Sequence, residues 1–130
     1  MLLPITSMTA VCLVPLFLFL TFRVIVYRRT HRVSIGDQGD QVLLRRMRMH
    51  ANFIEYTPYA LLLLLLCEIQ DVTNWALWVS ASLLLIGRYI HAFGLSSPKT
   101  KGLYRVGGMV LTISSIVTSS LMLLLASFGY

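Results

Sequence analysis

The chain has 130 residues, of which 57% are hydrophobic and only 12% are charged, and its formal net charge is +6. Soluble domains are roughly a quarter charged, so this composition excludes an ordinary water-soluble protein and favours a polytopic membrane protein. The basic residues border apolar segments and form no basic helix, so membrane topology explains them better than nucleic-acid binding. Cys12 and Cys67 lie in apolar segments without metal-ligand spacing, so we expect buried thiols and no metal site.

The first apolar segment, residues 1–22, is uncharged and long enough to span a bilayer, which takes about 20 residues. Positive charge follows this segment instead of preceding it, and there is no small-residue cleavage site, so we expect a transmembrane helix and not a signal peptide. Pro4 suits its first turn, and Pro15 is expected to bend it. A basic loop is predicted over residues 23–41, where the arginines anchor the chain at the interface or, for Arg28, lean toward a bound anion.

Three further spans are predicted. The second helix is expected over residues 40–67, with polar first turns, leucine-rich last turns and a kink at Pro58. After a short connection over residues 68–74, a third span is predicted over residues 75–94 and a fourth over residues 103–128. Small residues of the fourth span are expected to form a packing surface. They are Gly107, Gly108, Thr112, Ser115 and Ser119.

Positive charge is distributed on one side only. All eleven Lys and Arg residues lie in the loops over residues 23–41 and 95–102 or in the adjacent helix ends. This asymmetry predicts that both basic loops are cytoplasmic and both termini outside. We therefore expect an all-α membrane protein, one domain over residues 1–130, built as a four-transmembrane-helix bundle. Short loops and a C-terminal SFGY without a retention signal favour a bacterial inner membrane.

A polar stripe precedes the leucine-rich part of the second helix. Arg48, Asn52 and Glu55 are spaced i, i+4 and i+7, so they share one helix face, with Arg45 one turn earlier. A carboxylate so close to a span is costly unless it faces protein, water or a partner charge. Several cations beside one carboxylate suit a zwitterionic ligand of net negative charge, because arginine binds carboxylates and Glu55 can accept an ammonium or amide N–H. The alternative is an internal ion pair that holds helices together.

The pattern R-x-x-x-N-x-x-E-Y-x-P at residues 48–58 resembles the second-helix signature of the MAPEG family (membrane-associated proteins in eicosanoid and glutathione metabolism). The segments GRYIHAFG (residues 87–94) and RVGGM (residues 105–109) are similar to the third-to-fourth helix region of the family's bacterial branch. The four-helix layout and the length also match, so the resemblance covers essentially the whole chain.

The resemblance implies a homotrimer that binds glutathione, as co-substrate, between protomers near the cytosolic face. An apolar electrophile or a lipid hydroperoxide would reach the thiol from the bilayer. Arg105 matches the arginine credited with stabilising the glutathione thiolate, whereas Phe93 stands where the leukotriene-forming members have a tyrosine. By matching positions, the residues implied to hold glutathione are Arg48, Asn52, Glu55, Tyr56 and Tyr89, with Arg28 and His50 in contact in some members.

Three functions are compatible with these observations. The first is an integral membrane glutathione-dependent transferase or peroxidase. The second is a small proton-coupled multidrug exporter, which also has four helices and uses one membrane glutamate, although Glu55 has an arginine nearby and the loop charge is strongly biased. The third is a non-catalytic membrane protein that binds a lipid or a protein partner. Arg88 is expected to be structural, pairing with Glu55 or an interfacial group, and His31 and His91 are expected at the interface.

Overall fold

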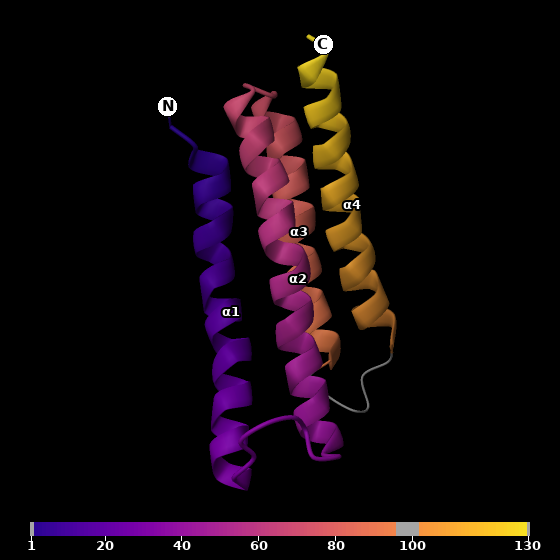
Figure 1. Cartoon of the computed structure of the whole chain (residues 1–130). Helices are drawn as coiled ribbons and strands as arrows, with labels where there is room; N and C mark the ends of the chain where they lie inside the picture. Colours follow the sequence, from indigo (N-terminus) through magenta and orange to yellow (C-terminus); the bar gives the residue numbers. More distant parts are fainter. Residues whose placement is uncertain (1, 96–101, 130) are drawn as a thin grey trace.

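The computed structural model describes residues 2–95 and 102–129. These residues form helices α1 (Pro4–His31), α2 (Gln41–Ile69), α3 (Asn74–Leu95) and α4 (Gly102–Ser127). The helices alternate in direction within one bundle, so both ends of the chain lie at the same end of it (Figure 1). All four are long and apolar enough to cross a membrane. The predicted all-α, four-span bundle is confirmed, while the predicted second basic loop lies mostly outside the described residues.

The first helix is longer than predicted. It continues to His31, and it ends where Arg32 adopts a left-handed backbone with φ 54° and donates its N–H toward the carbonyls of Arg28 and Arg29. The basic residues assigned to a loop from residue 23 are therefore mostly helical, because no Gly or Pro interrupts residues 16–31 and cations are favourable near a helix C-terminus. The prediction that Pro4 lies in the first turn is confirmed.

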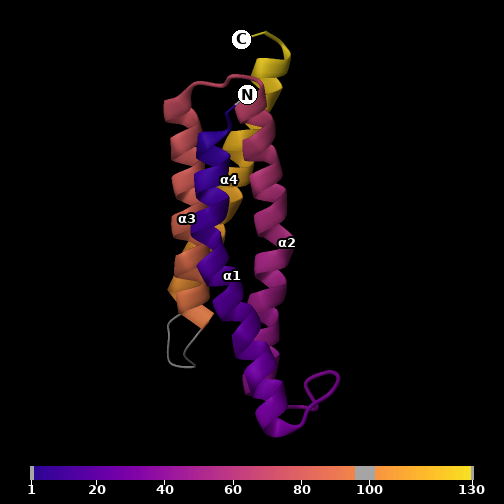
Figure 2. The ribbon, with the colours of Figure 1, turned by 90° about the vertical axis from the view of Figure 1, so that its left-hand side faces the viewer.

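The α1–α2 hairpin projects beyond the lower ends of α3 and α4 in both ribbon views (Figures 1 and 2). Asp40 begins α2, and its carboxylate accepts hydrogen bonds from the backbone N–H groups of Val42 at 2.8 Å and Leu43 at 3.1 Å. The Tyr27 hydroxyl of α1 donates to the same carboxylate at 2.7 Å. These bonds, that of Tyr27 first, hold the pKa of the Asp40 carboxyl below its usual range.

Helices α3 and α4 approach each other closely through small residues. A Cβ atom added at Gly108 would lie 2.6 Å from the Gly87 carbonyl oxygen. Further up, the Ser80 and Ser119 hydroxyls are 2.6 Å apart, and Ser115 donates to the Ser80 carbonyl at 2.8 Å. The predicted packing surface is confirmed for the four residues of α4 that are buried. They are Gly108, Thr112, Ser115 and Ser119. Gly107 was wrongly included, because a Cβ atom there would have open space around it.

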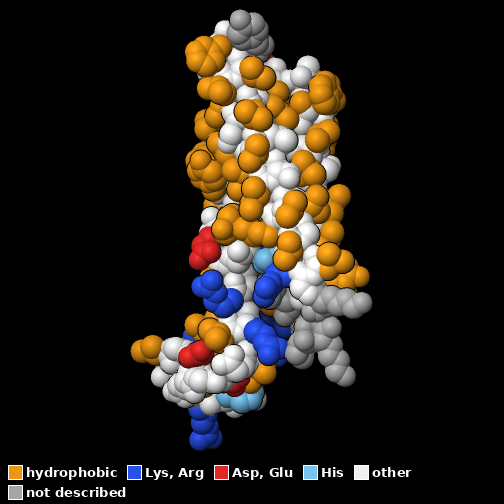
Figure 3. Space-filling view, turned by 90° about the vertical axis from the view of Figure 1, so that its right-hand side faces the viewer, with side chains coloured by type: hydrophobic (Ala, Val, Ile, Leu, Met, Phe, Trp, Pro, Cys, Tyr) orange, Lys and Arg blue, Asp and Glu red, His pale blue; other side chains and the backbone are white. Residues whose placement is uncertain are grey.

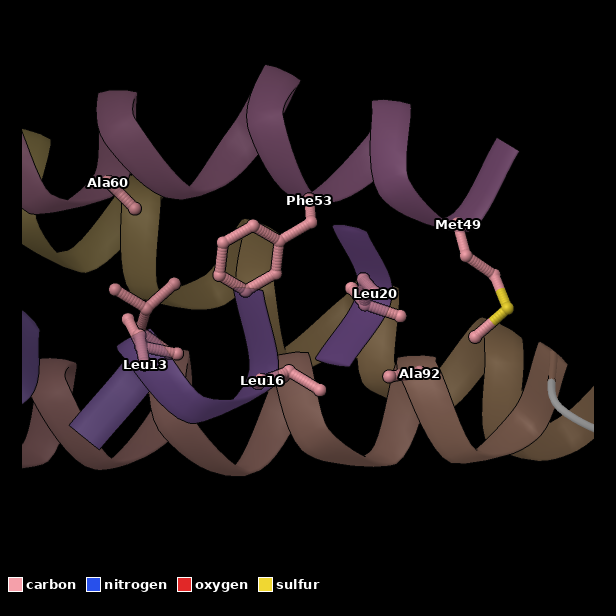
Figure 4. Close-up of a cluster of buried hydrophobic side chains, with 8 residues drawn as sticks. Leu13, Leu16, Leu20, Met49, Phe53, Ala60 and Ala92 are labelled. Carbon is pink, nitrogen blue, oxygen red and sulfur yellow. The ribbon is translucent and has the colours of Figure 1, made fainter. Parts of the chain in front are cut away.

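The core on the hairpin side of the bundle is apolar and draws on three helices. The Phe53 side chain of α2 projects toward the leucines of α1, with Ala92 of α3 beside them (Figure 4). The labelled members are Leu13, Leu16, Leu20, Met49, Phe53, Ala60 and Ala92. This packing fixes the side of α2 that faces inward, and hence the side that carries the polar stripe.

Glu68 connects α2 to the start of α1. The residue before α1, Leu3, has no side chain that can cap a helix. The buried Glu68 carboxylate does so instead, since its two oxygens accept hydrogen bonds from the Ile5 and Thr6 N–H groups, each at 2.8 Å. A carboxylate is well suited here, because the first N–H groups of a helix lack partners and carry partial positive charge. Glu68 was expected in the connection after α2 and is instead part of the helix.

Candidate functional site

The polar stripe on α2 forms as the spacing predicts. Arg48 and Glu55 are exposed, and Asn52 between them is partly buried. Neither the Arg48 nor the Glu55 side chain makes a hydrogen bond or ion pair with any other residue in the described ranges 2–95 and 102–129. The structure therefore gives no support to an internal ion pair, and it leaves both charges accessible to a ligand or to another chain.

Arg88 of α3 lies directly behind the stripe. Its side chain is only 1% exposed. Its Nη2 atom donates to Asn52 Oδ1 at 2.7 Å, and its guanidinium lies 5.5 Å from the centre of the Phe53 ring. The expected pairing of Arg88 with Glu55 was wrong: Arg88 bonds the amide that faces α3, whereas Glu55 points outward. The sequence predicts a structural Arg88 beside the stripe, and the structure shows that its partner there is Asn52.

The stripe also faces α4. The Asn52 Nδ2 atom lies 3.9 Å from the sulfur of Met109. Arg105 is one turn before Met109 on the same side of α4, and Arg48 is one turn before Asn52 on α2. Because α2 and α4 run in the same direction, this contact places the exposed Arg48 and Arg105 at a similar level. Seen from the α4 side, basic and acidic side chains gather below the apolar part of the surface (Figure 3).

His91 holds the start of α4 against α3. Its ring Nδ1 donates to the main-chain carbonyl of Arg105 at 2.9 Å, and its side chain is buried. His91 was expected at the membrane interface, and the structure shows its side chain buried inside the bundle instead of exposed on its surface. The bond matters for the site because it fixes the backbone of Arg105 while the guanidinium remains exposed. In the sequence, the only signal for this role is that His91 follows Gly87 by one helical turn. The structure shows that α4 approaches α3 closely at Gly87.

Tyr89 lies on a different face of α3 from its neighbour Arg88. Its hydroxyl donates to the Cys12 carbonyl of α1 at 2.8 Å, and its side chain is half-exposed. It lines an apolar groove of about 330 Å³ between α1 and α3. The other lining residues are Pro15, Leu16, Phe19, Ala92 and Phe93. Within one chain, Tyr89 is therefore next to an apolar groove and is not joined to the stripe.

The remaining candidates lie at varying distances from the stripe. Tyr56 is half-buried one turn after Asn52. His50 packs against α1, with its Nε2 atom 3.0 Å from the Thr21 hydroxyl. Arg28 turns toward α2 and the hairpin loop, with Nη2 at 3.2 Å from the Met47 sulfur.

In one chain the structure thus brings together Arg48, Asn52, Glu55, Tyr56 and Arg105, and leaves Tyr89, His50 and Arg28 on other faces. No group of three His, Cys, Asp or Glu residues in the described part of the chain could hold a metal ion.

Comparison with known proteins agrees with this architecture. The model of the MAPEG family matches residues 6–126. Proteins named Inner membrane protein YecN, from two strains of Escherichia coli, are each 29% identical over 126 residues, which is 97% of this chain and 92% of theirs. No solved structure matches. With its four candidate spans, the chain is a multi-pass inner membrane protein. Since the family match extends over nearly the whole chain, this protein belongs to the MAPEG family.

Proposed function

We propose that the protein is an integral membrane glutathione-dependent transferase or peroxidase that acts on apolar electrophiles or lipid hydroperoxides. The observation that carries this proposal is the stripe itself: Arg48 and Glu55 stand exposed and unpaired within the described chain, beside an Asn52 held by a buried arginine. Glutathione carries two carboxylates and one ammonium. Arginine binds carboxylates strongly, and the carboxylate of Glu55 suits the ammonium.

Arg105 supplies the chemistry in this proposal. A guanidinium beside a thiol lowers its pKa and so favours the thiolate, which is the nucleophilic form. The thiolate would attack an electrophilic carbon, so that a C–S bond forms as the bond to the leaving group breaks and that group departs with the electron pair. With a lipid hydroperoxide it would attack the terminal oxygen, so that an S–O bond forms, the O–O bond breaks and the released alkoxide takes up a proton. A second glutathione thiol would then displace water from the resulting sulfenic acid and form the disulfide. The apolar groove between α1 and α3 is not joined to the stripe of its own chain, so it would lead such a substrate from the bilayer to the thiol held by a neighbouring protomer. Support for placing Arg105 here comes from the contact between Asn52 and Met109, one turn away on α4.

We further propose that the site is completed in a homotrimer. Exposed polar side chains next to a membrane span are costly unless protein or water covers them. His50 and Arg28 turn away from the stripe of their own chain, so they would contact glutathione only from a neighbouring protomer. Cross-linking of the protein in native membranes tests the oligomeric state independently of ligand binding.

The first experiment measures thermal stabilisation of the detergent-purified protein by glutathione. A ligand that binds only the folded form raises its apparent stability by mass action. Glu55→Ala and Arg48→Ala should abolish the stabilisation, and Arg29→Ala, which removes an exposed arginine from α1 outside the stripe, should retain it. Wild-type protein that is not stabilised by millimolar glutathione would overturn the proposal.

The second experiment measures conjugation and peroxidase rates with a panel of apolar electrophiles and lipid hydroperoxides. Arg105→Ala should lose turnover and keep thermal stabilisation by glutathione, because its proposed role is to stabilise the thiolate. Equal rates in both proteins would remove Arg105 from the mechanism. Binding without turnover across the panel would indicate a non-catalytic binding protein, and proton-driven cation efflux that Glu55→Gln abolishes would indicate an exporter.

A further inference from the structure

The bond between Arg88 and Asn52 fixes the orientation of the Asn52 amide. A guanidinium has donors and no acceptor, so the amide atom that faces Arg88 must be the oxygen. The distance of 2.7 Å from Nη2 to Oδ1 is that of a strong, charge-assisted hydrogen bond. Because Arg88 is 1% exposed and packed against Phe53, it has little freedom to move away and release the amide.

Because its oxygen is directed at Arg88, Asn52 offers its NH₂ group on the side away from Arg88. That group lies 3.9 Å from the Met109 sulfur, which is a weak acceptor. We propose that Arg88 is a positioning residue, which acts through Asn52 so that the middle of the stripe presents only hydrogen-bond donors. The site then selects a carboxylate or carbonyl oxygen at that point. This inference rests on the proposed function.

The positive charge of Arg88 also favours a ligand with an acidic group in front of Asn52. No ion pair joins Arg88 to another described residue, and its Nε and Nη1 atoms are buried without a hydrogen-bond partner there. A buried, uncompensated cation is costly, and an anion bound in front of Asn52 would reduce that cost. The buried guanidinium therefore favours an acidic ligand without touching it.

A ligand-free cycle tests the pairing. Asn52→Asp should leave the protein at least as stable as wild type, because the carboxylate would pair with Arg88. Arg88→Met should still fold, since it replaces a buried cation that has no ion-pair partner among the described residues with an apolar side chain of similar length. In the Arg88→Met background, Asn52→Asp should lower the melting temperature. An equal effect of Asn52→Asp in both backgrounds would overturn the pairing.

A second cycle tests positioning, with glutathione as the ligand and apparent Kd from thermal shifts as the readout. Asn52→Asp should weaken binding by at least about 10-fold despite its intact fold, because a donor becomes a repelling carboxylate. Arg88→Met should weaken binding by about 10-fold in the wild-type background and clearly less in the Asn52→Ala background, where only the effect of its charge on the ligand is left to lose.

A purely structural Arg88 predicts the same loss in both backgrounds, and that result would overturn the positioning role. Wild-type protein that fails to bind glutathione would overturn the proposed function and the ligand-facing part of this inference together, whereas the ligand-free cycle would still decide the pairing.

Discussion

The Glu68 cap yields a sharp stability prediction. In Glu68→Ala, the N–H groups of Ile5 and Thr6, each now 2.8 Å from a carboxylate oxygen, lose their acceptors in a buried setting. A hydrogen bond to a charged group contributes about 1.5–3 kcal/mol, and losing a helix cap costs about 0.5–2 kcal/mol. Because the two bonds share one side chain, we expect Glu68→Ala to lower the free energy of unfolding by about 2–4 kcal/mol. Glu68→Gln keeps one acceptor oxygen and should lose about half as much.

The assay is reversible unfolding in mixed detergent micelles, followed by the fluorescence of Trp75 and Trp78 at the same end of the bundle. Asp71→Asn is the matched control, because Asp71 is an exposed carboxylate three residues after Glu68, in the connection that follows α2, and Asn tolerates its left-handed φ of 54°. The free energy of unfolding of the Asp71→Asn control should stay within about 0.5 kcal/mol of the wild-type value. If Glu68→Ala did the same, the cap would not contribute to stability and the reasoning would be refuted.

Three further predictions concern other parts of the molecule. Gly108→Ala should destabilise the protein by about 1–3 kcal/mol because the added methyl group meets the α3 backbone, whereas Gly107→Ala, with open space around it, should not; equal melting temperatures would contradict this. The folded state depresses the pKa of Asp40, so its contribution is complete above an ordinary carboxyl pKa of about 4 and is lost as pH falls through the lower folded value. The difference in unfolding free energy between wild type and Asp40→Asn should therefore shrink below about pH 4. A difference that stays constant with pH would contradict a stabilising role of the Asp40 carboxylate. Ser34→Cys, placed in the hairpin loop of a cysteine-free background, should react with a membrane-impermeant maleimide only after the inner membrane is opened; labelling of intact spheroplasts would reverse the predicted orientation.

The positions of the four helices could be predicted from the sequence, because hydropathy and periodicity are properties of each segment alone. The starts of α2 and α3 follow from capping residues and turn chemistry, and both were predicted to within one residue. The end of α1 is not predicted, because clustered arginines after an apolar span favour a loop. Charged residues do not end a helix, and here the helix stops only where Arg32 takes a left-handed conformation.

The candidate site was predictable only in part. Spacing along α2 was enough to place Arg48, Asn52 and Glu55 on one face. The partner of Arg88 depends instead on how α3 is rotated against α2, which no spacing within one helix specifies. Glu68 is a similar case, because its role requires the start of α1 to lie beside the end of α2, more than sixty residues away in sequence.

The unequal lengths of the helices have a consequence for access. At about 1.5 Å per residue, α2 is roughly 44 Å long and α3 roughly 33 Å. At the end of the bundle near the termini, α2 and α3 reach almost the same height. Most of the extra length of α2 is therefore at the opposite end, where the α1–α2 hairpin extends past α3 and α4 (Figure 2). Asn52 meets α3 near the depth where the bundle narrows from four helices to two. A water-soluble molecule could reach this depth along the hairpin from the aqueous phase, and an apolar molecule could reach it laterally from the bilayer. The water-soluble molecule would not have to enter the lipid, and the apolar molecule would not have to enter water.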